Sequence, residues 1–215
     1  MYADTIYVRA FEDRMDLLRV AMIGASGTRY QDGLFFFDLR MPPSYPNMPP
    51  QSLLPLFRLP LLNTFSGEGT EVWLPGTSSL LQVVVSLRAL VLNDQPFYNE
   101  AGYEHLIDRP EGHRQELPYN ENAFLLTLRT MLHLLRRPPQ GFEGFVRDHF
   151  RQRGRYILGM CEAHLHGCID AGHGSMELQC STGFRVALAN VVPKLTVAFT
   201  QIGAQGCDHC TTTKH

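Results

Sequence analysis

The first forty residues alternate between short apolar runs and polar connections. An extended start at residues 6–8 precedes a polar connection and a second apolar run, Leu17 to Ile23. After a glycine-containing turn, a third run, Leu34 to Leu39, is apolar at nearly every position, which indicates burial on both faces of a sheet. Consecutive short strands joined by turns predict an antiparallel meander.

A proline-rich segment interrupts this pattern. Five prolines lie within residues 42–50, and each one fixes φ and removes a backbone donor. The segment is therefore predicted to be a rigid crossing loop. Residues Ser52 to Leu62 are apolar enough for one more strand, although Pro55 and Pro60 weaken it.

From Ser78 onward the apolar spacing becomes helical. Ser78 or Ser79 can cap a helix that runs to about Val91. We interpret residues 93–119 as irregular. The pattern then predicts three further helices, which run from about Asn120 to 137, within 140–170, and from about Gly183 to Ile202 with a kink or interruption near Pro193. Strands followed by helices indicate the α+β fold class.

Composition narrows the possible partners and settings. The chain has 215 residues, of which 44% are hydrophobic and 19% charged, and a net charge of -2, so bulk charge favours neither a nucleic-acid nor a membrane partner. The longest apolar stretch, Leu80 to Leu92, contains Arg88 and is shorter than the roughly 20 residues of a spanning helix. The N-terminus carries acidic residues, unlike a secretory signal. Without a signal, the odd count of five cysteines indicates a reducing compartment, and the expected location is cytoplasmic or nuclear.

All the cysteines lie in the last quarter of the chain, and the first 160 residues contain none. Zinc requires four nitrogen or sulfur ligands, so two groups with short spacings were considered as a zinc site. The first group is Cys161, His164, His166 and Cys168, of which a helix would turn His166 to another face. The second is the run Cys207-Asp208-His209-Cys210 together with His215. The alternative, which we favour, is ordinary helix residues and a loose tail without a metal.

Arginines recur between residues 136 and 155, with Glu143 and Asp148 among them. The main interpretation is a solvated helix face. A docking face for an acidic partner is the alternative. The arginines concerned are Arg136, Arg137, Arg147, Arg151, Arg153 and Arg155.

Several stretches, taken in order, resemble one family, the ubiquitin-conjugating enzyme core. The resemblance is closest to its large, ligase-independent members, and the C-terminal run 148–154 resembles the plant members of that group. It extends over about residues 4–203. The matching stretches are residues 13–19, 27–30 and 33–38, Tyr45-Pro46, Pro49-Pro50, Trp73, the 78–91 helix and residues 96–103.

In this family a cysteine thiolate carries ubiquitin as a thioester, which a target lysine then attacks. An upstream asparagine supports the oxyanion or its loop. The resemblance places both elements between the double proline and the tryptophan, which here is the interval Gln51 to Val72. This interval contains no cysteine, no histidine and no Asn-Pro pair.

The family's cysteine position falls near Arg58, and the resemblance implies that roughly fifteen residues are absent there, about the length of two to three strands. No catalytic residue and no metal ligand is therefore assigned, and no cofactor is expected. The family's first helix would also precede residue 1. The residues expected to line the groove or mark the fold are Tyr45, Pro46, Pro49, Pro50, Trp73, Asn99 and Glu100.

The expected organisation is a truncated ubiquitin-conjugating core at 1–137, a C-terminal helical extension at 138–203 and a disordered tail at 204–215. The resemblance implies ubiquitin, ubiquitin-activating enzyme and protein substrates as partners. Three functions follow. The chain is a defective or misspliced product of an active transferase gene, a catalytically dead protein that binds ubiquitin or a partner, or a zinc-stabilised interaction module.

Overall fold

The structure is a computed structural model that describes residues 5–52, 72–99, 103–107, 109–166 and 180–207. Within these ranges four strands form one antiparallel sheet in the order β1-β2-β3-β4, so the predicted meander is confirmed. The predicted strand at 52–62 begins as β4, and its remainder lies outside the described residues. The strands are β1 (Ile6–Phe11), β2 (Arg14–Ile23), β3 (Leu34–Arg40) and β4 (Gln51–Ser52).

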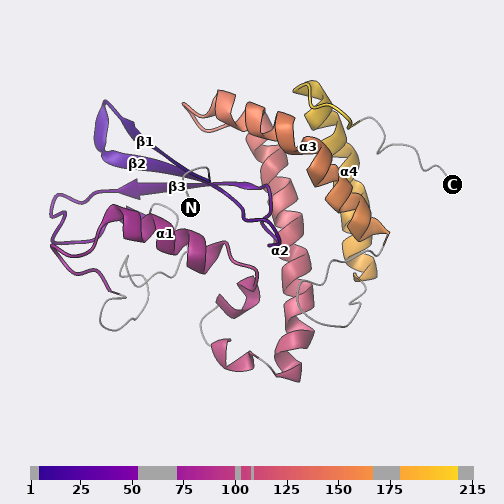
Figure 1. Ribbon diagram of the computed structural model, residues 1–215, viewed down its shortest axis with the longest axis horizontal. Coiled ribbons are helices and arrows are strands. Elements are labelled where there is room, and N and C mark those ends of the chain that lie inside the picture. Colours follow the sequence, from indigo (N-terminus) through magenta and orange to yellow (C-terminus); the bar gives the residue numbers. More distant parts are fainter. Residues whose placement is uncertain (1–4, 53–71, 100–102, 108, 167–179, 208–215) are drawn as a thin grey trace.

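The central strands are buried on both faces because successive side chains point to opposite sides of the sheet. Val20 pairs with Phe37 and contributes to a core beneath α1 (Leu80–Val91), whereas the next pair, Ala21 with Phe36, faces the other helices. The continuous apolar run at residues 34–39 is thereby explained. Figure 1 shows α1 on one side of the sheet and the long helices on the other.

Six helical elements of the described residues follow the sheet, and they complete the predicted α+β class. Beyond α1 come two short 3-10 helices and three long α-helices. Their bounds are η3 (Pro96–Asn99), η4 (Glu104–Leu106), α2 (Pro110–Arg136), α3 (Glu143–Leu165) and α4 (Thr182–Gln201).

The described residues form two hydrophobic cores. The α1-side core comprises Trp73 and the buried apolar residues of α1 and of one sheet face, including Val20, Phe37 and Leu87. The helical core comprises the buried apolar residues of α2, α3 and α4 together with Ala21 and Leu34 of the other sheet face. The sheet thus separates a core under one helix from a core enclosed by three.

The prediction for the start of α2 was wrong by ten residues. Residues 110–119 belong to the segment 93–119 that the sequence predicts as irregular, and they are mostly polar and contain two prolines. Pro110 occupies the first turn, where its missing N–H is not needed, and Pro118 lies inside the helix at an exposed position. Contacts to η3 hold this polar segment, since the Tyr98 hydroxyl lies 3.4 Å from a Glu116 carboxylate oxygen.

The other helices agree more closely with the prediction. Ser79 caps α1, where its side chain accepts from the Gln82 N–H and the Gln82 side chain accepts from the Ser79 N–H. α4 passes through Pro193 without interruption, and this proline is exposed to solvent. No helix in the described part of the chain combines the length and the apolar character needed to cross a membrane.

The C-terminal end is described as far as Cys207. The predicted tail begins at residue 204, but the chain continues against α3 and α4 for four more residues, and Cys207 is completely buried in the helical core. Residues 208–215 lie outside the described residues.

Candidate functional site

Three of the predicted site residues lie together at the loop between β3 and β4. The Trp73 indole N–H donates to the Pro46 carbonyl over 2.8 Å, and the Tyr45 and Trp73 rings are 5.9 Å apart between centroids. Trp73 is only 6% exposed and packs in the α1-side core. The Tyr45-Pro46 peptide bond is cis. The proline loop is therefore attached to the start of the α1 segment through one indole.

The remaining predicted site residues have no described contact with Trp73. Pro49 and Pro50 are buried and lead directly into β4. Asn99 ends η3, which follows the C-terminal end of α1, whereas Trp73 precedes its N-terminal end. No described contact brings Asn99 to Trp73, and Glu100 lies outside the described residues.

The position expected for a nucleophile, near Arg58, lies outside the described residues. The three described cysteines are elsewhere: Cys161, Cys180 and Cys207 are all buried in the helical core. The sheet separates that core from Trp73. Burial raises the pKa of the Cys180 thiol, which favours the thiol over the nucleophilic thiolate.

Among the described residues, one contact between a cysteine and a histidine bears on the zinc hypothesis. The Cys180 sulfur lies 3.8 Å from Nδ1 of His164, which packs against Phe124 and Phe184. Burial lowers the pKa of this histidine. Within the described ranges, no three His, Cys, Asp or Glu side chains are grouped to hold a metal ion. The proposed ligands Cys168, Cys210 and His215 lie outside those ranges.

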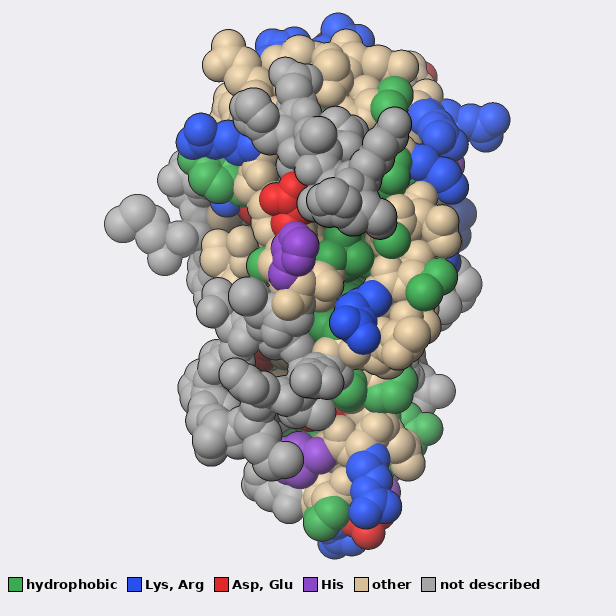
Figure 2. All heavy atoms as spheres, turned by 90° about the vertical axis from the view of Figure 1, so that its right-hand side faces the viewer, with side chains coloured by type: hydrophobic (Ala, Val, Ile, Leu, Met, Phe, Trp, Pro, Cys, Tyr) green, Lys and Arg blue, Asp and Glu red, His purple; other side chains and the backbone are tan. Residues whose placement is uncertain are grey.

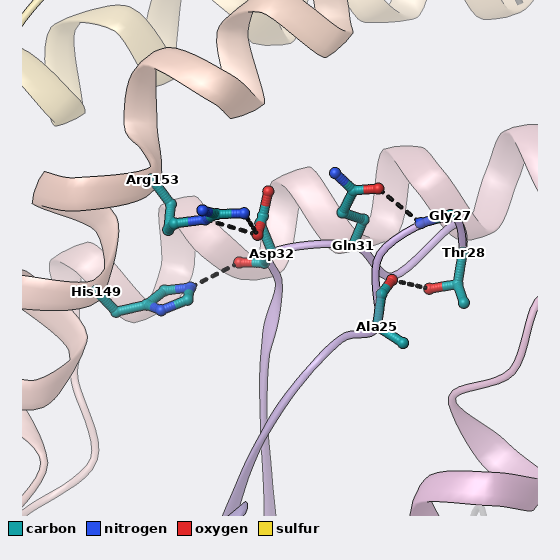
Figure 3. A network of polar contacts seen from close by, with 7 residues as sticks. All are labelled: Ala25, Gly27, Thr28, Gln31, Asp32, His149 and Arg153. Atoms are coloured by element: carbon teal, nitrogen blue, oxygen red, sulfur yellow. Dashed lines mark hydrogen bonds and ion pairs between the residues drawn. The ribbon is translucent and has the colours of Figure 1, made fainter. Parts of the chain in front are cut away.

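A polar network that the sequence did not predict joins the sheet to α3 (Figure 3). Asp32, in the turn between β2 and β3, is 4% exposed and has a positive φ of 58°. One of its carboxylate oxygens accepts from Arg153 at 2.8 Å and 2.7 Å. Its carbonyl accepts from Nε2 of His149 at 2.8 Å. Both donors lie one turn apart on α3, so they fix this helix against the turn.

The network corrects one prediction about the arginine-rich segment. Arg153 is not part of a solvated helix face, because its guanidinium is paired with a buried carboxylate. Arg147, Arg151 and Arg155 are exposed, as the solvated-face interpretation requires. The pairing was missed because Asp32 and Arg153 are 121 residues apart, and no local spacing links them. Burial lowers the pKa of His149, so its neutral form donates to Asp32.

Comparison with known proteins agrees with this architecture. Residues 2–55 match the family model described as "Ubiquitin-conjugating enzyme". The chain is 46% identical over 217 residues to "Probable ubiquitin-conjugating enzyme E2 24" of Arabidopsis thaliana, with 93% of this chain and 24% of that protein covered. It is 39% identical over 224 residues to "Putative ubiquitin-conjugating enzyme E2 38" of the same plant, with 94% and 69% covered.

A human relative is less similar. The chain is 33% identical over 178 residues to "Dual E2 ubiquitin-conjugating enzyme/E3 ubiquitin-protein ligase BIRC6" of Homo sapiens, with 74% of this chain and 4% of that protein covered. The chain spans about a quarter of the first plant relative and about two thirds of the second. The match to the second includes most of both proteins. On these grounds, together with the meander, the proline loop and its tryptophan, the chain belongs to the ubiquitin-conjugating enzyme family and is more similar to these plant members than to the human one.

Proposed function

We propose that this chain is a ubiquitin-conjugating family protein that does not itself carry ubiquitin as a thioester. The observation that supports this is the distribution of thiols. The sequence has no cysteine before Cys161, and the three described cysteines are buried on the far side of the sheet from Trp73. Thioester carriage needs an accessible thiolate, and no other side chain replaces it.

The length of the alignment to the first plant relative supports a loss of about the size that the family resemblance implies. The match to the first plant relative extends over 217 positions, whereas 93% of this 215-residue chain is about 200 residues. About 17 positions therefore have no residue in this chain. That is close to the roughly fifteen residues, two to three strands in length, that the family pattern lacks between Pro50 and Leu61.

A block loss favours a splicing or gene-structure defect over an evolved loss of activity. A pseudoenzyme commonly arises by substitution of the nucleophile, with its surroundings kept. Here the asparagine segment and the cysteine are both absent, while family-like sequence resumes at Leu61. Reading the transcript between Gln51 and Leu59 tests this directly. An in-frame coding segment with a cysteine there supports the defect, and uninterrupted coding sequence contradicts it.

In this proposal the intact gene product moves ubiquitin from ubiquitin-activating enzyme to protein substrates in the cytoplasm or nucleus. The truncated core at 1–137 and the extension at 138–203 fold together, because the helical core draws residues from both. The tryptophan and α1 remain in place without the nucleophile. The catalytically dead alternative therefore keeps a folded surface that can bind ubiquitin or a partner enzyme.

A charging assay tests the central claim. The purified chain is incubated with ubiquitin-activating enzyme, ATP and ubiquitin, and an active member of the family serves as the positive control. We expect no ubiquitin adduct that reductant removes. If such an adduct forms on this chain, the proposal is wrong, and single Cys→Ser variants at all five cysteines would then identify the carrier.

Noncovalent binding separates the two inactive alternatives. Isotope-labelled ubiquitin is titrated with the chain, and chemical shifts are followed. Shifts that saturate as the chain is added support a ubiquitin-binding role. Spectra that remain unchanged at millimolar chain favour a defective product without a ubiquitin partner.

A further inference from the structure

An open groove with a volume of about 800 Å³ lies between α2 and α4. It runs along the C-terminal half of α2 and the N-terminal two thirds of α4. Its size is within the range of ligand-binding clefts, which is about 300 to 1,000 Å³. It lies apart from the Trp73 region, because α2 and α4 belong to the helical core.

The rim of this groove is strongly cationic. Four of its lining side chains are Arg129, Arg136, Arg137 and Lys194. None of the four has a hydrogen bond or an ion pair from its side chain to any other described residue. α4 contains no Asp or Glu, and α2 contains none after Glu121. Positive charge is therefore concentrated on one surface of a chain whose net charge is -2.

The space-filling view also shows an excess of cationic over anionic side chains on one face of the molecule. Figure 2 shows the side of the molecule on which α3 and α4 lie. Lys and Arg side chains are spread over this face, few Asp or Glu side chains lie between them, and hydrophobic side chains are exposed among them. Cations that lack acidic neighbours repel one another, and a complementary anionic partner relieves that repulsion.

The groove is also apolar at its base. Leu132 and Val191 are buried beneath the charged rim, and Val186 lines the groove with 58% of its surface exposed. A phosphate backbone does not use such a base, whereas the apolar face of a peptide helix does. A hydrophobic floor with charged edges is the arrangement that receives an amphipathic helix.

We propose that the α2–α4 groove binds an acidic amphipathic helix of a partner protein. Apolar side chains of that helix cover Val186 and Val191, and its Asp and Glu side chains pair with the four rim cations. This binding does not depend on thioester chemistry, so it holds whether or not the chain carries ubiquitin. The charging assay therefore tests only the proposed function, and the peptide-binding assay tests only the groove, so a contrary result in one leaves the other proposal standing.

The test uses the full chain and a labelled helical peptide of about eighteen residues, long enough to form a helix in the groove. Leucines are spaced at i, i+3, i+4 and i+7, and glutamates occupy the opposite positions. A peptide of the same composition in shuffled order is the first control. We expect saturable binding by fluorescence anisotropy for the patterned peptide and at least about tenfold weaker binding for the shuffled one.

Charge reversal tests the rim. The double variant Arg136→Glu/Arg137→Glu should weaken binding by about tenfold or more and reduce its dependence on salt. The matched control, Arg114→Glu/Arg147→Glu, changes the net charge equally at exposed sites outside the groove. It should bind within about twofold of the unchanged chain. Equal weakening by both variants would show attraction to overall charge alone and would overturn the proposal.

A second pair of variants tests the apolar base. Val186→Asn should weaken binding, whereas Val197→Asn on the same helix should not, since Val197 is equally exposed at 57% but does not line the groove. Circular dichroism checks that each variant is folded. No difference between the two, or tighter binding to single-stranded RNA or anionic vesicles than to the peptide, would contradict a helix-binding groove.

Discussion

The two faces of the sheet are covered by regions of different depth. On one face the described part of the chain places α1, a helix of 12 residues, over the sheet together with Trp73. On the other face α2, α3 and α4 enclose a core that extends well beyond the sheet, and they contain 27, 23 and 20 residues. The face on which Trp73 lies is thus the less enclosed one.

Among the described contacts, the face covered by the larger core also has more polar contacts between helix and sheet. α1 is joined to the sheet by Arg88, whose guanidinium donates to the Ile23 carbonyl at 2.8 Å. α3 is joined to the sheet by the buried Asp32 carboxylate as well as by His149. The comparison teaches that the α3 side of the sheet has both the larger core and the buried polar attachment.

The largest expected effect comes from one substitution made in each core. Leu128 in the helical core and Leu87 in the α1-side core are both completely buried. Leu128→Ala should lower the free energy of unfolding by about 4 kcal/mol and Leu87→Ala by about 2 kcal/mol, because a cavity beside one short helix can collapse more easily. Urea unfolding measures both. Equal costs, or a larger cost for Leu87→Ala, would break the comparison.

The next effect concerns the Asp32 attachment. Asp32→Asn keeps a residue that tolerates positive φ but removes the charge that pairs with Arg153. It should lower the free energy of unfolding by about 1.5 to 3 kcal/mol, since charge-assisted bonds at a buried carboxylate are lost. Asp16→Asn, in the exposed Arg14–Asp16 pair, is the control and should leave thermal unfolding unchanged. If Asp32→Asn leaves the free energy of unfolding unchanged, α3 is held against the sheet by packing alone.

Two glycines of α3 compare the side of this helix that packs against α4 with the side that faces open space. A methyl group at Gly154 would lie 3.1 Å from the Phe199 ring, whereas one at Gly159 would meet nothing within 4 Å. Gly159→Ala should stabilise the chain by up to about 1 kcal/mol through helix propensity. Gly154→Ala should be less stable than Gly159→Ala by at least about 1 kcal/mol, because the added methyl crowds α4. Matching thermal midpoints for the two variants would show that α4 moves freely.

The smallest expected effect is a pH dependence. The pKa of His149 is lowered in the folded chain by burial, so the unfolded chain binds the proton more readily. Its contribution to stability is present above the unfolded pKa of about 6.5 and is lost as pH falls below that value. His149→Gln keeps a donor for the Asp32 carbonyl but does not titrate. Urea unfolding between pH 7.5 and about 5 should show a shallower decline for this variant, and an unchanged slope would contradict a role for His149.

Much of the fold was predictable because it depends on neighbouring residues. Short apolar runs joined by turns predicted the meander, the Ser79 cap marked the start of α1, and the prolines at 42–50 marked the loop. The start of α2 was not predictable, because residues 110–119 have no apolar stripe and are held by contacts with η3.

The sequence by itself determined the α+β order, the family resemblance and the absence of any cysteine before Cys161. These follow from residue type and local spacing. Only the tertiary structure decided that Trp73 donates to Pro46, that Asp32 pairs with Arg153, and that α2 and α4 form a cationic groove. Each of these joins residues that are far apart in the chain, and their proximity arises only when the two cores pack against the sheet.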